Sequence, residues 1–453
     1  MHDLRFTLRN LARSPGFAAA AILTLAVAIG ANTAMFSILY AVVLQPLPFR
    51  ESERLVRVWE TDRHNDSERE AASAPDFEDW KSQQRVFANV AGTTNRMLNL
   101  TERNEEAERI SASAVSHDYF AMLGVAPIAG RAFVAADDKQ GAAPVAILSD
   151  ALWQRRFGRR DVIGKRITLD GVTHEVVGVM PRGASLSREP SEVWTPLALA
   201  LAQFRDARGV HNVYVIGRLK DGVGVTRAQS EMTVIAERLA KQYPNDNVGR
   251  GAFVEPLIDS MVRDARPRLF LLGGAVLAVL LIACINVAGL MLARADSRNR
   301  ELAIRASLGA SRGRIVRQLL TEAAAIATIG GVVGVVLAWW GTKTIVALAP
   351  SLPRAETIGV NLPVLGFALL VSFVAAILFG VVPAIRTSAV KPASALAGTR
   401  GVLRATRTAG RGVLVIIEVA MAVVLVTGAG LLLKSFSKLM AVDVGLSTEN
   451  VVT

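Results

Sequence analysis

Residues 269–292 read LFLLGGAVLAVLLIACINVAGLML, and residues 294–317 carry seven arginines against two acidic residues. The first stretch holds no charged residue and is longer than the roughly 20 residues that a helix needs to cross about 30 Å of hydrocarbon. The second stretch therefore carries a net charge of +5. An uncharged apolar run followed at once by a dense positive segment is typical of a membrane-spanning helix that ends at a cytoplasmic surface.

The same alternation of apolar runs and basic segments recurs along the chain. Five runs are long enough to cross a bilayer, namely Phe17–Leu44, Leu269–Leu292, Leu319–Leu348, Val364–Ile385 and Val413–Leu433. Residues 1–16 carry a net charge of +2 and residues 386–411 carry +6, whereas residues 46–265 hold 29 basic and 31 acidic residues. Since basic loops stay on the cytoplasmic side, we predict a cytoplasmic N-terminus and an exported domain between the first two spans.

The charge distribution also bounds the partners. The 453-residue chain has a formal net charge of +12, which would usually raise nucleic acid as a ligand. The excess lies in the membrane-flanking segments, so we exclude nucleic acid and expect contact with the lipid bilayer. Cys284 is the one cysteine and lies in the second span, so the exported domain contains no disulfide. The first run is too long for a cleaved signal peptide, and we interpret it as an uncleaved anchor.

The predicted fold is a membrane protein with an α-helical bundle of five spans and a large α+β extracytoplasmic domain inserted between spans 1 and 2. The expected parts are a cytoplasmic amphipathic segment (1–16), the first span (17–44), the extracytoplasmic domain (45–266), a permease domain (267–390, with spans at 269–292, 319–348 and 364–385 and an elbow at 294–317), a basic linker (391–412), the fifth span (413–433) and the start of a second exported domain (434–453). Because residues 413–452 loosely repeat residues 18–56, we expect either the N-terminal part of a longer duplicated protein or a truncated product.

The exported region shows strand and helix patterns in alternation. We expect strands at 55–59, 145–148, 166–169, 174–179 and 213–219, and helices at 74–87, 152–157 and 226–242. The pair Asp170-Gly171 lies between two of these strands and is a strong hairpin signal. This order favours one or two α+β subdomains over a long parallel sheet.

Small residues recur at four-residue spacing in two of the spans. Ala26, Gly30 and Ala34 share one face of the first span, and Gly330 and Gly334 share one face of the third. Small residues let two helix backbones approach closely in lipid. The same spacing also arises by chance in helices rich in alanine and glycine, so both interpretations stay open at this point.

The chain carries no recognisable catalytic pattern. Residues 158–165 resemble a phosphate-binding loop, but five residues separate the glycines where four are needed, and Arg166 replaces the required Ser or Thr. None of the five histidines has a second ligand at metal-binding spacing, and no G-x-S-x-G elbow occurs. We therefore predict no catalytic, cofactor-binding or metal-binding residues, no cofactor and no enzyme activity in this chain.

Two carboxylates lie inside the apolar spans. Glu418 is about a third of the way into the fifth span, and Glu322 lies near the start of the third. Because charged groups in hydrocarbon usually face the protein interior, Glu418 is the candidate intramembrane polar residue. We expect it either to bond to another helix or to belong to a transport path.

Several motifs together resemble a known family. Near the start these are Arg9–Phe17 (RNLARSPGF), Ile29–Phe36 (IGANTAMF) and Leu44–Phe49 (LQPLPF); in the exported part they are Asp118–Val125 (DYFAMLGV), Leu148–Gly158 (LSDALWQRRFG), Val176–Pro181 (VVGVMP) and Val193–Pro196 (VWTP). Most specific is Ala283–Ala288 (ACINVA) leading to Arg300–Ser311 (RELAIRASLGAS). The chain resembles the MacB/FtsX-type permeases of the ABC superfamily, and among them the duplicated ADOP permeases, because it has five spans and no N-terminal ATPase domain.

The resemblance implies a function and a set of contacts. A permease of this kind couples a cytoplasmic ABC ATPase subunit to a periplasmic domain, for export or mechanotransmission, in the bacterial inner membrane. A periplasmic adaptor is a second expected partner, and the full-length form would be a dimer or an intramolecular pseudo-dimer. The ATPase-coupling segment would contain Arg300, Glu301, Arg305, Leu308 and Gly309. The alternative function is a membrane-anchored extracytoplasmic sensor or binding protein that has no ATPase partner.

Overall fold

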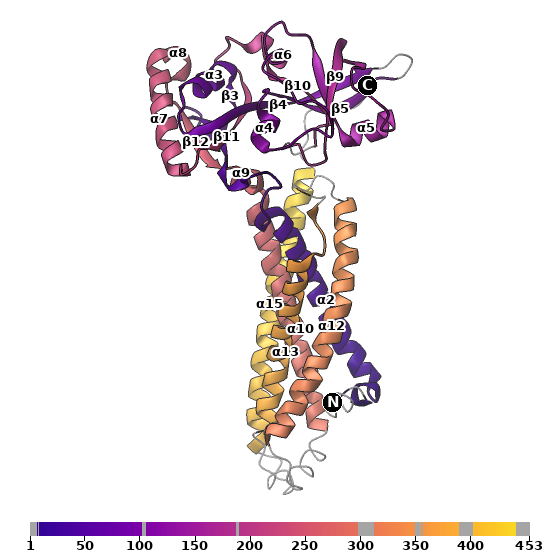
Figure 1. The fold of residues 1–453 in the computed structure, drawn as a ribbon. Helices are drawn as coiled ribbons and strands as arrows, with labels where there is room; N and C mark the ends of the chain where they lie inside the picture. The colour runs from indigo at the N-terminus through magenta and orange to yellow at the C-terminus, as the bar shows by residue number, and fades with distance from the viewer. Residues whose placement is uncertain are drawn as a thin grey trace. The chain divides into compact units, whose positions relative to one another are not determined.

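The computed structural model describes residues 7, 9–101, 106–186, 190–297, 312–348, 354, 357–388 and 402–440. The chain divides into two compact units, which are drawn in Figure 1. The α/β unit is Gln45–Asp264, and the helical unit is Met1–Leu44 together with Ala265–Thr453.

The α/β unit is built on one twelve-stranded sheet, whose main path runs β12-β1-β11-β4-β5-β10-β7-β9-β6. The strands are β1 (Leu55–Asp62), β2 (Ser67–Glu70), β3 (Ala72–Ser73), β4 (Phe87–Thr101), β5 (Glu108–Val115), β6 (Ala129–Gly130), β7 (Val145–Ser149), β8 (Arg166–Leu169), β9 (Val172–Met180), β10 (Val193–Pro196), β11 (His211–Leu219) and β12 (Arg250–Pro256). Paired strands are antiparallel except for β5 with β10 and β7 with β9, which are parallel.

Part of this sheet closes on itself. Strand β8 pairs with β9 on one side and with the end of β4 on the other, so β4, β5, β10, β7, β9 and β8 form a closed ring of pairings. One buried cluster takes residues from all six strands, among them Leu100, Ile110 and Ile167. Closure therefore gives this half of the unit its own core, and the exposed sheet edges are reduced.

Seven α-helices and two 3-10 helices complete the α/β unit within the described residues: α3 (Ala74–Gln83), α4 (Tyr119–Leu123), α5 (Asp150–Phe157), α6 (Leu197–Ala200), α7 (Val225–Gln242), α8 (Pro244–Asn247) and α9 (Leu257–Val262), with η2 (Ser52–Arg54) and η3 (Ala202–Phe204). Helices α3 and α7 cover one face of β1, β11 and β12, where Phe77, Met232 and Val254 share a buried cluster. A second cluster contains Phe120 of α4 and Trp194 of β10. Their rings meet edge to face, with centroids 5.5 Å apart.

Capping residues explain where two helices begin. The Ser73 hydroxyl accepts a hydrogen bond from the Asp76 backbone N–H at 3.1 Å, and the Ser149 hydroxyl accepts one from Leu152 at 3.1 Å. Each satisfies a donor that the first turn of a helix leaves free. The helix expected at 152–157 therefore begins two residues earlier, at Asp150.

All eight predicted strands and helices of the α/β unit are present, but several of their bounds differ, and strand β4 is among the strands that were not expected. The helix expected to reach residue 87 ends at Gln83, because Gln84 is extended and Phe87 already opens strand β4. The fifteen-residue strand β4 was not expected, since its run of Thr, Asn and Arg shows no clean alternation. Tertiary pairing with β11 and β5, not local propensity, holds this segment extended.

Among its described residues, the helical unit contains five helices that are long and apolar enough to cross a membrane, as the sequence predicted. They are α2 (Pro15–Leu39, continued by a π-helical turn, η1, at Tyr40–Leu44), α10 (Ala265–Ser297), α12 (Arg312–Leu348), α13 (Leu362–Ser388) and α15 (Val402–Met440). Helix α2 packs against α10, α12 and α13. Their shared buried cluster includes Leu25, Val287, Ile326 and Phe379.

The small residues of the first and third spans face each other. A Cβ atom added to Gly334 would lie 3.0 Å from the carbonyl oxygen of Ala26 and 3.1 Å from the backbone nitrogen of Gly30. A Cβ on Gly30 would lie 2.9 Å from the carbonyl oxygen of Gly334. The four-residue spacing is thus a close helix–helix contact between α2 and α12, which settles the question left open by the sequence.

Candidate functional site

The predicted coupling segment falls between two described helices. Its residues Arg300, Glu301, Arg305, Leu308 and Gly309 lie outside the described residues. What the structure does describe are the two flanking ends, α10 up to Ser297 and α12 from Arg312. A candidate site must therefore be built from the side chains around these ends.

One asparagine joins the flanking helices to the start of the chain. The Asn10 side-chain amide donates a hydrogen bond to Glu322 Oε1 of α12 at 2.9 Å. Its backbone carbonyl accepts a hydrogen bond from Arg294 Nη2 of α10 at 2.9 Å. We call Asn10, Arg294 and Glu322 the polar junction. It ties the segment before α2 to both helices that lead into the predicted coupling segment.

Apolar contacts fix the polar junction in place. The Arg294 guanidinium lies over the Phe17 ring, with Cζ 4.4 Å from the centroid, so its charge is also held by the aromatic face. Leu11, one residue after Asn10, is buried in the same cluster as the helices. Glu322 is only 4% exposed. A carboxylate this buried beside apolar helices needs hydrogen-bond donors, and hydrogen bonds between helices contribute about 0.6–2 kcal/mol each.

The sequence singled out Glu322 as an ionisable group near the start of a span but gave no partner for it. The missing signal was Asn10, a polar amide in the amphipathic segment that precedes the first span. The separation of 312 positions between the two residues cannot be read from any local pattern. Only the packing of the N-terminal segment against α12 brings them together.

The candidate intramembrane residue Glu418 is placed differently. It lies on α15 and is half-buried. Helix α15 packs against α10, but its most apolar window contains no buried residue. Among the described residues, no group donates a hydrogen bond to the Glu418 carboxylate. The structure therefore does not bring Glu418 into the polar junction.

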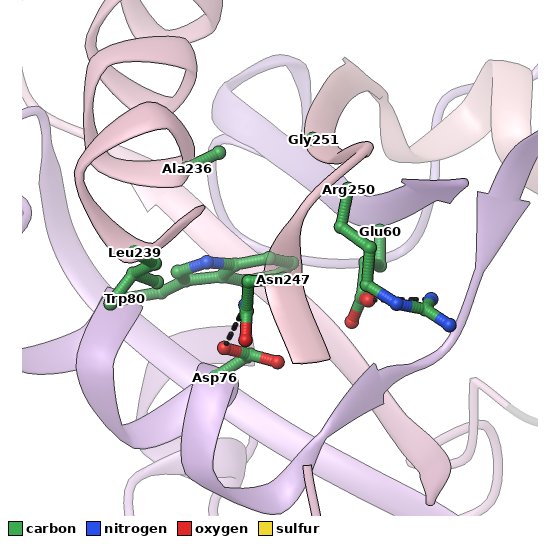
Figure 2. Close-up of a pocket in the computed structure, with 8 residues that line it drawn as sticks. All are labelled: Glu60, Asp76, Trp80, Ala236, Leu239, Asn247, Arg250 and Gly251. Carbon is green, nitrogen blue, oxygen red and sulfur yellow. Dashed lines mark hydrogen bonds and ion pairs between the residues drawn. The ribbon is translucent and has the colours of Figure 1, made fainter. Parts of the chain in front are cut away.

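The α/β unit contains a small pocket with a dense charge network (Figure 2). Arg250 Nη1 donates to Glu60 Oε1 at 2.8 Å, and the Asn247 amide donates to Asp76 Oδ1 at 2.8 Å. Arg208 bonds Asp76 as well, at 2.6 Å. Each buried carboxylate in the pocket is thus matched by a donor, which is the arrangement of a structural network rather than of a reactive group.

Two histidines of the α/β unit have shifted pKa values. His211 Nδ1 lies 3.2 Å from Glu60 Oε2, and this hydrogen bond raises the pKa of His211 above its ordinary value. Burial lowers the pKa of His174. Within the described part of the chain, no three His, Cys, Asp or Glu side chains gather to hold a metal ion.

Family models match most of the chain. The model for the MacB-like periplasmic core domain matches residues 18–235, and the model for the FtsX-like permease C-terminal domain matches residues 273–392. The first match covers the first span and the α/β unit as far as the middle of α7. The second covers most of α10 together with the predicted coupling segment, α12 and α13. The two domains follow each other in the order that the motifs predicted.

Curated relatives agree with these models. The chain is 29% identical over 272 residues to a pyoverdine export ATP-binding/permease protein, PvdT, of Pseudomonas syringae, covering 60% of this chain and 40% of that protein. It is 27% identical over 315 residues to a macrolide export ATP-binding/permease protein, MacB, of Azoarcus, covering 68% and 46%. The chain thus spans less than half the length of these relatives.

Solved structures give a weaker likeness. The periplasmic region of MacB from Actinobacillus actinomycetemcomitans matches with a TM-score of 0.36 and 14% identity, over 48% of this chain and 94% of that one. The extracellular domain of YknZ, a noncanonic ABC-type transporter from Gram-positive bacteria, matches with a TM-score of 0.33 and 16% identity, over 44% and 99%.

Proposed function

We propose that this chain, which belongs to the MacB/FtsX-type permeases of ABC transport systems, couples a separate ABC ATPase to its own periplasmic domain. The chain is a multi-pass membrane protein with a MacB-like periplasmic core domain. We place it in the bacterial inner membrane, with the N-terminus cytoplasmic and residues 45–266 periplasmic. The alternation of basic and neutral segments supports this orientation.

The polar junction is the observation that carries the coupling proposal. A displacement of the segment between α10 and α12 by the ATPase would reach the polar junction first. Arg294 and Glu322 lie in the two helices that flank this segment. From there the displacement passes to α2, which touches α12 backbone to backbone at Gly30 and Gly334. Helix α2 is followed directly by the periplasmic domain in the chain. Close-packed helices move as rigid elements, so a shift at one end is felt at the other.

The coupling residues follow from the family resemblance. Arg300, Glu301, Arg305, Leu308 and Gly309 belong to a basic segment that the proposed topology leaves on the cytoplasmic side. There they would meet the ATPase, with a periplasmic adaptor as a further partner on the opposite side. The chain would act as a dimer or as one half of an intramolecular pseudo-dimer.

Co-purification tests the ATPase partnership. The tagged full chain is isolated from its native host in mild detergent, and bound ABC ATPase subunits are identified by mass spectrometry. We expect an ATPase with the unaltered chain and its loss in Arg300→Glu and Glu301→Arg. Arg227→Glu, a charge reversal on α7 of the α/β unit, is the matched control and should keep the ATPase.

A second variant separates association from coupling. Glu322→Gln should retain the bound ATPase but reduce the stimulation of ATP hydrolysis by the permease, because it weakens the junction without touching the basic segment. If no ATPase co-purifies with the unaltered chain, the anchored sensor replaces the permease as the better function. If both charge reversals keep the ATPase, the assignment of the coupling residues is wrong.

A further inference from the structure

Two buried arginines lie on neighbouring strands of the α/β unit, and they differ in their hydrogen bonding. Arg57 of β1 is 9% exposed and Arg218 of β11 is 8% exposed. Arg218 donates to the carbonyl oxygens of Met122 at 3.0 and 2.6 Å, of Arg50 at 2.7 Å and of Glu51 at 3.2 Å. Arg57 donates no hydrogen bond to any residue that the structure describes, and its Nε is fully covered without an acceptor.

Aromatic rings surround Arg57 in place of acceptors. Its Cζ lies 5.2 Å from the centroid of Trp59 and 5.7 Å from that of Tyr214. The two rings meet edge to face, with centroids 6.1 Å apart. Such faces attract a cation but leave its N–H groups unbonded. Arg57 Nε is fully covered without an acceptor, whereas the two terminal nitrogens are not among the fully covered unpartnered atoms of the described residues.

The nearest carboxylate is already occupied. Glu255 lies directly opposite Arg57 in the pairing of β1 with β12. It accepts hydrogen bonds from Trp59 Nε1 at 2.7 Å and from Arg263 at 2.9 Å, and it lies 3.5 Å from Arg69. Arg69 also pairs with Glu68 at 3.0 Å, and Arg263 pairs with Glu255, whereas Arg57 forms no ion pair with any described carboxylate.

The lack of an acceptor for Arg57 is energetically unfavourable in the protein without a ligand. A buried charge that lacks hydrogen-bond partners destabilises the folded state, and burial lowers the pKa of Arg57 accordingly. A core position facing Ile216 across the strand pair would accept an apolar side chain without this penalty. An unpaired guanidinium at such a place is what a preorganised anion site requires.

We propose that Arg57, Trp59 and Tyr214 form a binding site for a ligand that carries a carboxylate on a flat apolar body. The guanidinium fork matches the two oxygens of a carboxylate, and the ring faces accept the apolar body. The site lies wholly within the α/β unit and goes beyond the proposed coupling function, since ligand binding there does not require an ATPase.

Calorimetric titration of the full chain in lipid nanodiscs tests the site. The probes are benzoate, its neutral analogue benzamide, and inorganic phosphate. We expect benzoate to bind at least tenfold more tightly than benzamide or phosphate, and Arg57→Met to lower the benzoate affinity at least tenfold. Arg57→Lys keeps the charge but loses the fork, so it should also bind benzoate more weakly.

Thermal melting distinguishes a ligand site from a structural cation. Arg57→Met should melt at the same temperature as the unaltered chain or higher, because it removes an unpaired buried charge. Arg218→Met is the matched control and should melt several degrees lower, because it leaves carbonyl groups without donors. Equal affinity for benzoate and benzamide, or tighter binding of phosphate, would overturn the proposal. So would an Arg57→Met variant that melts as low as Arg218→Met and still binds benzoate.

Discussion

The two units of this protein bury their side chains against different surroundings. In the α/β unit the fully buried residues include large rings such as Phe77, Phe120 and Trp194, and charged groups pair in networks around them. In the helical unit the tightest contact is made by glycines, and leucines point outward in large numbers. The hydrophobic effect in water drives the burial of side chains in the α/β unit. In the helical unit the close fit of helix backbones takes its place, because lipid tails are as apolar as leucine.

Helix α15 shows that an apolar composition alone does not bury the residues of a helix. It is as suitable a span by length and composition as α2 or α12, yet its apolar window buries no residue. Gly428 and Gly430 of α15 have nothing within 4 Å of an added Cβ, whereas Gly30 and Gly334 face backbone atoms. The difference lies in where small residues meet a partner, not in hydrophobic content.

The largest effect should come from truncating a buried ring in the α/β unit. Phe77→Ala is expected to lower the free energy of unfolding by about 3–5 kcal/mol, because a ring is lost from a water-excluded core. Phe379→Ala, on the buried face of α13, should lower it by about half as much or less, because the ring remains in apolar surroundings when the helices separate. Urea unfolding of the α/β unit and detergent-driven unfolding of the helices measure the two values. Equal losses would contradict the contrast between the units.

A side chain at the glycine contact should have an intermediate effect. Gly334→Leu forces backbone atoms of α2 and α12 apart and is expected to destabilise the helical unit by about 1–3 kcal/mol. Gly341→Leu, two turns further along α12, meets nothing within 4 Å and serves as the control. Detergent-driven unfolding compares the two variants. A Gly341→Leu variant as unstable as Gly334→Leu would show that leucine itself, rather than the contact, is responsible.

The smallest effect should be a pH dependence confined to the α/β unit. The pKa of His211 is raised above 6.5 in the folded state, so its contribution to stability is fully present below pH 6.5 and is lost as the pH rises through the folded value. The pKa of His174 is lowered below 6.5, so stability falls as the pH drops from 6.5 toward the folded value. The α/β unit should therefore be most stable near pH 6.5.

Paired variants check this maximum. His211→Gln should flatten the decline above pH 6.5, and His174→Gln should flatten the decline below it. Urea unfolding of the full chain between about pH 5.5 and about pH 8 measures both slopes. The helical unit has no histidine among its described residues and should not respond over the same range. A flat profile in the unaltered α/β unit would contradict the role given to both histidines.

Local sequence patterns correctly predicted the elements that have a clear strand or helix periodicity. Strand β8 was expected at its observed bounds, and helix α7 was expected one residue short of its start. Strand β4 was not predicted from the sequence, because some of its side chains face water and others face the core without regular alternation, as its uneven burial shows. The polar junction was not predicted for a different reason, since it depends on a hydrogen bond between Asn10 and Glu322, which lie far apart in the sequence.

The sequence by itself determined the membrane spans, because uncharged runs of sufficient length act through local free energies of transfer that need no partner. Its motifs carried the resemblance to the family. The tertiary structure alone decided which small residues touch, which carboxylate finds a donor, and that Arg57 lies buried between two rings without an acceptor. These properties depend on contacts between segments that are far apart in the sequence, and such contacts form only when the chain folds.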